Sequence, residues 1–201
     1  MSAAPVEFYY DFSSPYGFLA AHKIGALAAR HGRSVEWNPI LLGVVFRQTG
    51  SAPLTEIPLK GEYSKRDFVR SARFHGLPFR MPSRFPVATQ VPARIVTWLK
   101  ESHPELVQPA TLAMYGAYFE HDRDISAPEN ALAAAAGVGV DANAARTAIE
   151  SAAVKDALKA AMERAVARGV FGSPFVFVDG EPFWGLDRFD QIERWLSDGP
   201  F

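Results

Sequence analysis

The pattern of hydrophobic and polar positions at the start of the chain changes from strand-like to helical and back again. Residues 6–12 read VEFYYDF, an aromatic-rich run that is typical of a strand. Ser14 and Pro15 follow, and serine as N-cap with proline in the first turn is a strong helix-start signal. Apolar residues then recur at helical spacing as far as residue 30, and residues 34–42 predict a second strand. The first part of the chain therefore reads as β-α-β.

The middle of the chain is helical and interrupted by prolines. Residues 49–59 and 76–92 hold several prolines, so both segments are expected to be extended or irregular. The remaining segments have helical patterns, at residues 63–75, 93–100, 109–121, 128–136 and 142–168. The last of these is long and alanine-rich, and we expect one break within it.

The end of the chain returns to strands. Residues 175–178 are an apolar, β-rich run, and residues 181–184 are a candidate return strand. Between them Asp179 and Gly180 form one of the strongest two-residue hairpin signals. Residues 187–196 predict an amphipathic closing helix.

The order of these elements indicates the fold class. A βαβ unit, a helical block and a ββα unit form the layout of an α/β protein with a thioredoxin-like domain and an all-helical insertion, in its DsbA-like form. We assign residues 1–48 and 169–201 to the thioredoxin-like domain. Residues 49–168 are then the helical insertion and its connecting helices.

Composition narrows the chemistry that this chain can perform. It has 201 residues and no cysteine, which excludes disulfides, a thiol nucleophile of the protein's own and a cysteine zinc site. The net charge of −1 gives no electrostatic reason to expect binding to nucleic acid or to an anionic membrane. Neither a long apolar run nor the features of a signal peptide are present, so the cytoplasm is the expected location. The histidines lack metal-binding spacing, so no metal site is expected.

Two motifs resemble the same pair of enzyme families. Residues 11–20 read DFSSPYGFLA, with serines and a proline at the corner where redox thioredoxins hold a cysteine pair. This resembles the D-x-x-S-P-Y/F-S-Y/W-L signature of kappa-class glutathione transferases and 2-hydroxychromene-2-carboxylate isomerases. Residues 169–175 (GVFGSPF) and 183–188 (FWGLDR) resemble the same families. The sequence departs from their pattern at Gly17, where serine or threonine is common, and at Leu186, where the kappa class has a hydroxyl residue.

Ser14 is the candidate catalytic residue. A free thiol has a pKa of about 8.5, and only its thiolate is a good nucleophile. A hydroxyl donor at a helix N-terminus can hydrogen-bond the sulfur of glutathione, while the helix dipole favours its negative charge. Ser14 would then stabilise the thiolate without being a nucleophile itself, or it would serve only as an N-cap. Ser13 is the less favoured donor, because the serine of the families directly precedes the proline.

The resemblance also implies which residues hold glutathione as cofactor. Pro174 is expected to be cis, with the Ser173 backbone paired to the cysteinyl part of the tripeptide like an added strand. Asp187 and Arg188 would face the γ-glutamyl end, and Lys60 would meet the glycyl carboxylate. Plainer interpretations remain open: Pro174 as a loop proline, Asp187 as a helix cap and Lys60 as a solvated side chain.

The function that we favour is cis-trans isomerisation of a 2-hydroxychromene-2-carboxylate-like aromatic catabolite by reversible addition of glutathione thiolate. A kappa-like transferase uses the same thiolate, and a non-catalytic glutathione-binding module is a third alternative. The expected partner is a small aromatic-derived substrate, and the families suggest a homodimer. The proline-rich segment 79–92 is expected to wall the pocket for this second substrate, with Arg94 as a candidate contact.

Overall fold

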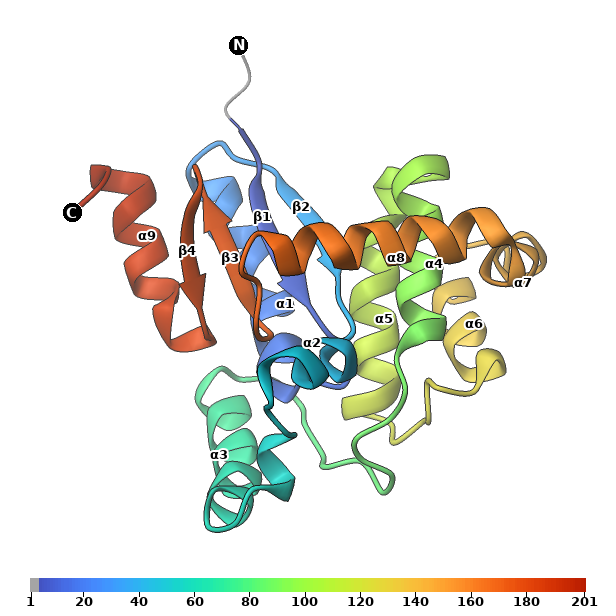
Figure 1. Ribbon diagram of the computed structural model, residues 1–201, viewed down its shortest axis with the longest axis horizontal. Coiled ribbons are helices and arrows are strands. Elements are labelled where there is room, and N and C mark those ends of the chain that lie inside the picture. The colour runs from blue at the N-terminus through green and yellow to red at the C-terminus, as the bar shows by residue number, and fades with distance from the viewer. Residues whose placement is uncertain (1–3) are drawn as a thin grey trace.

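The computed structural model describes residues 4–201, in which four strands form one mixed sheet of order β2-β1-β3-β4 (Figure 1). β1 (Val6–Tyr10) lies parallel to β2 (Val35–Pro39) and antiparallel to β3 (Phe175–Val178). β3 pairs antiparallel with the edge strand β4 (Glu181–Trp184). The two ends of the chain therefore meet at the centre of the sheet, as the predicted βαβ–ββα layout requires.

Alternate side chains of the two central strands face opposite sides of the sheet, which gives the molecule two cores. Phe8 and Val176 pack in the core that contains α1 (Pro15–Arg30). Tyr9 and Phe175 face the other side, where the buried residues come partly from α8 (Ala152–Ala167). In Figure 1, α8 crosses in front of the sheet and α1 lies behind it. Because both faces of β1 are covered, its carboxyl end is held in a well-packed environment.

The helical block leaves the sheet after β2 and returns to it before β3. Its helices are α2 (Leu42–Thr49), α3 (Lys60–Phe74), α4 (Gln90–Ser102), α5 (Val107–Phe119), α6 (Pro128–Ala136), α7 (Ala142–Glu150) and α8, with short 3₁₀ turns at Leu54–Glu56 and Pro104–Leu106. The expected break in the alanine-rich segment is confirmed at Ser151, whose Oγ accepts a hydrogen bond from Val154 N at 3.3 Å and caps α8. Within residues 4–201 no helix is both long and apolar enough to cross a membrane.

Several of the predicted element boundaries are wrong. The strand expected to reach residue 42 ends at Pro39, and α2 begins at Leu42. Helices were expected to begin at residues 93 and 109, whereas α4 begins at Gln90, before Pro92, and α5 begins at Val107, before Pro109. Both prolines occupy the third position of their helix, where a backbone N–H would have no acceptor within the helix. Proline is therefore tolerated there.

The closing element differs slightly from the prediction. A 3₁₀ turn at Leu186–Arg188 precedes α9 (Phe189–Asp198), so the regular helix begins two residues later than expected. Phe189 and Ile192 are buried and face β3 and the core behind the sheet. The turn places Asp187 and Arg188 at the rim of the sheet.

Candidate active-site cleft

A cleft of about 1530 Å³ opens at the carboxyl end of β1 and is bordered by α2, α3 and the turns that flank β3 and β4. Every site residue predicted from the motifs lines it: Ser14, Lys60, Ser173, Pro174, Asp187 and Arg188. Arg94 does not line it, because its guanidinium points to the carbonyl of Ile149 at the end of α7, 3.4 Å away. The expectation that Arg94 contacts the second substrate is therefore wrong.

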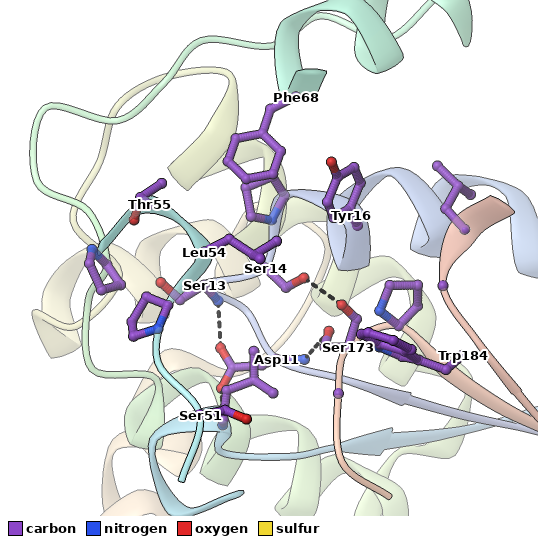
Figure 2. A pocket seen from close by; sticks show the side chains of 18 of the residues that line it. Asp11, Ser13, Ser14, Tyr16, Ser51, Leu54, Thr55, Phe68, Ser173 and Trp184 are labelled. Atoms are coloured by element: carbon purple, nitrogen blue, oxygen red, sulfur yellow. Dashed lines mark hydrogen bonds between the residues drawn. The ribbon is translucent and has the colours of Figure 1, made fainter. Parts of the chain in front are cut away.

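Ser14 joins the two ends of the chain through its hydroxyl. Its Oγ accepts a hydrogen bond from Gly17 N at 3.0 Å and donates one to the carbonyl oxygen of Ser173 at 2.9 Å (Figure 2). Ser14 is thus an N-cap whose hydroxyl also donates to the turn before β3, and its role toward a sulfur stays a prediction. To donate to a sulfur instead, the hydroxyl must turn its proton away from Ser173.

The turn before β3 is attached to the chain on both sides. The Ser173–Pro174 peptide bond is cis, which confirms the prediction for Pro174. Ser173 Oγ accepts a hydrogen bond from Asp11 N at 2.9 Å, and Gly185 N donates to the carbonyl of Pro174 at 3.0 Å. These two bonds attach the turn to β1 on one side and to the residue after β4 on the other.

Gly17, where the sequence departs from the family pattern, has a packing explanation. A Cβ at this position would lie 2.7 Å from both Ser173 Oγ and the hydroxyl of Tyr115. Real Cβ atoms essentially never approach neighbours that closely, so glycine leaves room for the side chain of Ser173.

The charged candidates lie at the rim of the cleft and are exposed. Arg188 Nη2 lies 3.3 Å from Asp187 Oδ2, and the Asp187 side chain is 73% exposed. Asp187 does not cap α9, because Arg188 is its N-cap residue and no side chain bonds the helix N-terminus. The interpretation of Asp187 as a helix cap is therefore wrong. Lys60 is the first residue of α3 instead of a loop residue.

The helix that carries Lys60 is attached to the corner at Ser14. The hydroxyl of Tyr16, in the first turn of α1, donates a hydrogen bond to Asp67 Oδ2 of α3 at 2.6 Å. The ring of Tyr16 packs edge-on against Phe68, with 5.0 Å between centroids. The position of α3 over the cleft is thus coupled to the residue that follows Ser14-Pro15.

Asp11 is a residue of the cleft whose role the sequence analysis missed. Its carboxylate is 2% exposed and accepts hydrogen bonds from Ser13 N at 2.6 Å, from Leu42 N at 2.7 Å and from Thr89 Oγ1 at 3.1 Å. Burial raises the pKa of the Asp11 carboxyl to about 6, although these hydrogen bonds each lower it. The signal was present, because Asp11 opens the DFSSPY motif, but its partners in α2 and before α4 are distant in sequence.

The proline-rich segment forms one wall of the cleft, as expected. Phe85, Pro86 and Val87 line it, with a cis bond between Phe85 and Pro86. Val87 N donates a hydrogen bond to Ser13 Oγ at 3.1 Å, so the wall is fixed to the residue before Ser14. Leu54 and other apolar residues of the α2–α3 region line the cleft as well (Figure 2). This part of the cleft suits an apolar or aromatic molecule.

The fold and the site together define a thioredoxin-like protein whose active corner holds serines in place of cysteines. The chain belongs to the family of DSBA-like thioredoxin domains, whose sequence model matches residues 5–197. It is 32% identical to 2-hydroxychromene-2-carboxylate isomerase of Sphingobium xenophagum, over 96% of this chain and 98% of the relative. It is 27% identical to human glutathione S-transferase kappa 1, over 97% of this chain and 94% of the relative.

A solved structure of 2-hydroxychromene-2-carboxylate isomerase has the same fold. It superposes with a TM-score of 0.83 at 25% identity, covering 96% of this chain and 94% of the other. A probable DsbA oxidoreductase from Streptomyces coelicolor, 22% identical and covered over 91% of its length, superposes over 98% of this chain with a TM-score of 0.78 and shares the fold. The relatives thus include isomerases and glutathione transferases, which supports enzymatic activity for this chain.

We predict that Asp11 makes the stability of the protein depend on pH. A carboxyl with a folded pKa of about 6 binds its proton more tightly than in the unfolded chain. Its contribution to the free energy of unfolding therefore falls by about 3 kcal/mol in all as the pH rises from about 3 to about 7, most steeply between about 4 and about 6. Urea unfolding of the wild type and of Asp11→Asn across this range measures the effect, because asparagine does not titrate. A difference between the two proteins that is constant with pH would contradict the prediction.

Proposed function

We propose that the protein is a glutathione-dependent cis-trans isomerase of a 2-hydroxychromene-2-carboxylate-like aromatic compound. The observation that carries the proposal is the placement of the Ser14 hydroxyl at the start of α1, beside the cis Ser173–Pro174 turn, in a chain without cysteine. A site with this geometry and no thiol of its own suits a thiol that comes from a bound molecule. The 32% identical isomerase supports the choice of reaction.

The residues of the cleft are complementary to glutathione along its whole length. The tripeptide has a thiol, a free peptide backbone, an amine and two carboxylates. Ser14 and the N-terminus of α1 suit the sulfur, and the Ser173 backbone suits the cysteinyl peptide groups. The charges of Asp187 and Arg188 suit the γ-glutamyl amine and carboxylate, and Lys60 suits the glycyl carboxylate. The residues present therefore fit this cofactor.

Ser14 and the helix N-terminus would hold the sulfur in its anionic form. A hydrogen bond to a charged group contributes about 1.5–3 kcal/mol, and a helix end contributes up to about 1 kcal/mol. Lowering a thiol pKa by about two units needs about 2.7 kcal/mol, so the two effects are sufficient. When bound, glutathione would supply a thiolate that adds to a carbon–carbon double bond conjugated to a carbonyl, with opening of the chromene ring. The former double bond could then rotate, and the thiolate would leave as the double bond re-forms. The apolar wall at Phe85 and Val87 would hold the aromatic substrate next to this sulfur.

A kappa-like glutathione transferase is the second candidate, supported by the 27% identity to the human kappa enzyme. Both reactions begin with the same activated thiolate, and they differ in the fate of glutathione. An isomerase regenerates it, and a transferase consumes it. A third possibility, a glutathione-binding module without catalysis, would bind the tripeptide and convert no substrate.

We expect many turnovers for each glutathione molecule. The measurement is conversion of 2-hydroxychromene-2-carboxylate, followed by its absorbance, with glutathione present far below the substrate concentration. Complete conversion indicates an isomerase, because the thiolate is released at the end of each cycle. Conversion that stops when the glutathione is used up would indicate a transferase and would contradict the proposal.

We predict that Ser14→Ala raises the pKa of the bound glutathione thiol by about one to two units, because one charge-assisted hydrogen bond is lost. Activity near pH 7 should fall by about threefold to 25-fold, in line with the smaller thiolate fraction when the pKa rises from about 6.5 to about 7.5–8.5. Glutathione affinity, measured by calorimetry, should change much less. Ultraviolet absorbance of the thiolate against pH measures the pKa directly.

Ser13→Ala is the matched control for this variant. It removes the hydroxyl of the neighbouring residue. That hydroxyl accepts a hydrogen bond from Val87 N and makes no bond to Ser173. We expect it to leave the pKa of the bound thiol unchanged. The loss of an N-cap in Ser14→Ala costs about 1 kcal/mol, so the stability of both variants has to be measured as well. If Ser13→Ala shifts the thiol pKa and Ser14→Ala does not, the donor is assigned to the wrong serine.

A further inference from the structure

Two walls of the cleft meet at one buried carboxylate. Asp11 Oδ2 accepts hydrogen bonds from Leu42 N, at the start of α2, and from Thr89 Oγ1, the residue before α4. Its Oδ1 accepts from Ser13 N, directly before Ser14. Asp11, Ser13, Leu42 and Thr89 all line the cleft. We call these three hydrogen bonds the Asp11 junction.

The Asp11 junction adds a specific contact to the packing of α2. Val45 is the residue of α2 that is fully buried, and Leu42 and Val44 are partly buried against the same core. Its N-cap residue, Leu41, provides no side-chain cap. The carboxylate of Asp11 takes the place of the cap by accepting from Leu42 N, and a negative charge is favourable at a helix N-terminus. Without Asp11, the first turn of α2 would lose its specific partner.

Thr89 donates its side-chain hydrogen bond to the same carboxylate. It is the N-cap residue of α4 and is 4% exposed, yet its side chain makes no capping hydrogen bond to that helix. Its hydroxyl donates instead to Asp11. A threonine that could cap its own helix is thus used to attach the start of α4 to the end of β1. The neighbouring Val87 is attached to Ser13 in the same region.

We propose that Asp11 is a positioning residue for the second substrate. Its carboxylate holds the start of α2 and the residue before α4 at a fixed distance from each other. This distance sets the width of the cleft in which the aromatic molecule would lie beside Ser14. The hydrogen bonds that would hold glutathione, at Ser14, Ser173 and the rim of the cleft, do not include the carboxylate of Asp11. The identity of the aromatic molecule rests on the proposed function, whereas the role of the junction in shaping the cleft does not.

Thr89→Val is the most direct test, because it removes one donor of the junction with little change in volume. We expect KM for 2-hydroxychromene-2-carboxylate to rise about fivefold or more, corresponding to one hydrogen bond of about 1 kcal/mol. The Kd of glutathione should stay within about twofold of the wild type. Thr89→Ser keeps the hydroxyl and should restore the wild-type KM. Asp11→Asn, in which an amide group replaces one acceptor oxygen, should have a larger effect in the same direction.

Thr111→Val is the matched control. Thr111 is fully buried, and its hydroxyl bonds the hydroxyl of Tyr10 at 2.8 Å, outside the residues that line the cleft. It should lose a similar amount of stability without a rise in KM. An equal rise of KM in Thr111→Val and Thr89→Val, or an equal loss of glutathione and substrate binding in Thr89→Val, would overturn the proposal.

A second readout separates this inference from the proposed function. If the wild type converts no chromene substrate, the proposed function fails, and the junction is then tested with 8-anilinonaphthalene-1-sulfonate, an aromatic anion whose fluorescence reports binding. A weaker Kd for this probe in Thr89→Val than in Thr111→Val supports the role of Asp11 in shaping the cleft. The same Kd in both variants overturns it.

Discussion

Asp11 is the residue at which the separate parts of the molecule are joined. Its backbone N–H donates to Ser173, its carbonyl accepts from Ser14 N at 3.0 Å and from the Tyr115 hydroxyl at 2.8 Å, and its carboxylate holds α2 and the start of α4. Burying a carboxylate is costly, and the raised pKa of Asp11 reflects that cost. The hydrogen bonds of the carboxylate that offset this cost lead to Ser13, to the start of α2 and to the residue before α4. The geometry of the cleft therefore depends on one buried charge at the end of β1.

Local signals in the sequence were enough to predict most of the fold. The Ser14-Pro15 start of α1 and the Asp179-Gly180 hairpin lie where they were expected, because each signal acts through backbone geometry within a few residues. α2 could not be predicted in this way. Its N-terminus is satisfied by Asp11, 31 residues earlier in the chain, and no local capping residue marks it.

The residues of the candidate site were likewise predictable where a local motif marks them and unpredictable where a long-range contact does. The motifs predicted the residues that line the cleft from both ends of the chain, and the structure brings them together. The Thr89–Asp11 bond joins residues 78 positions apart, and such a contact has no pattern in a single sequence. Arg94 failed as a candidate because a helix position alone does not say which side of the helix faces the cleft. Helix boundaries near Pro92 failed because a proline in the first turn is compatible with both a loop and a helix.

In the proposed function, the corner activates a thiol that comes from a bound molecule in place of a thiol of the protein. Hydroxyl groups, a helix N-terminus and a cis-proline turn provide electrostatic stabilisation and backbone pairing, which are useful only if a thiol ligand is placed among them. In the same proposal, the apolar wall next to this corner would determine which carbon the sulfur can reach. Specificity for the second substrate and activation of the thiol would thus be properties of neighbouring but different residues.

The most direct test is a crystal structure of the protein in complex with glutathione. We expect the sulfur within hydrogen-bonding distance of Ser14 Oγ, with the hydroxyl turned away from the Ser173 carbonyl. We also expect the cysteinyl peptide groups to pair with the Ser173 backbone, and the two ends of the tripeptide to reach Asp187–Arg188 and Lys60. A tripeptide bound elsewhere, or one in this cleft with its sulfur out of reach of Ser14, would contradict the glutathione-dependent mechanism.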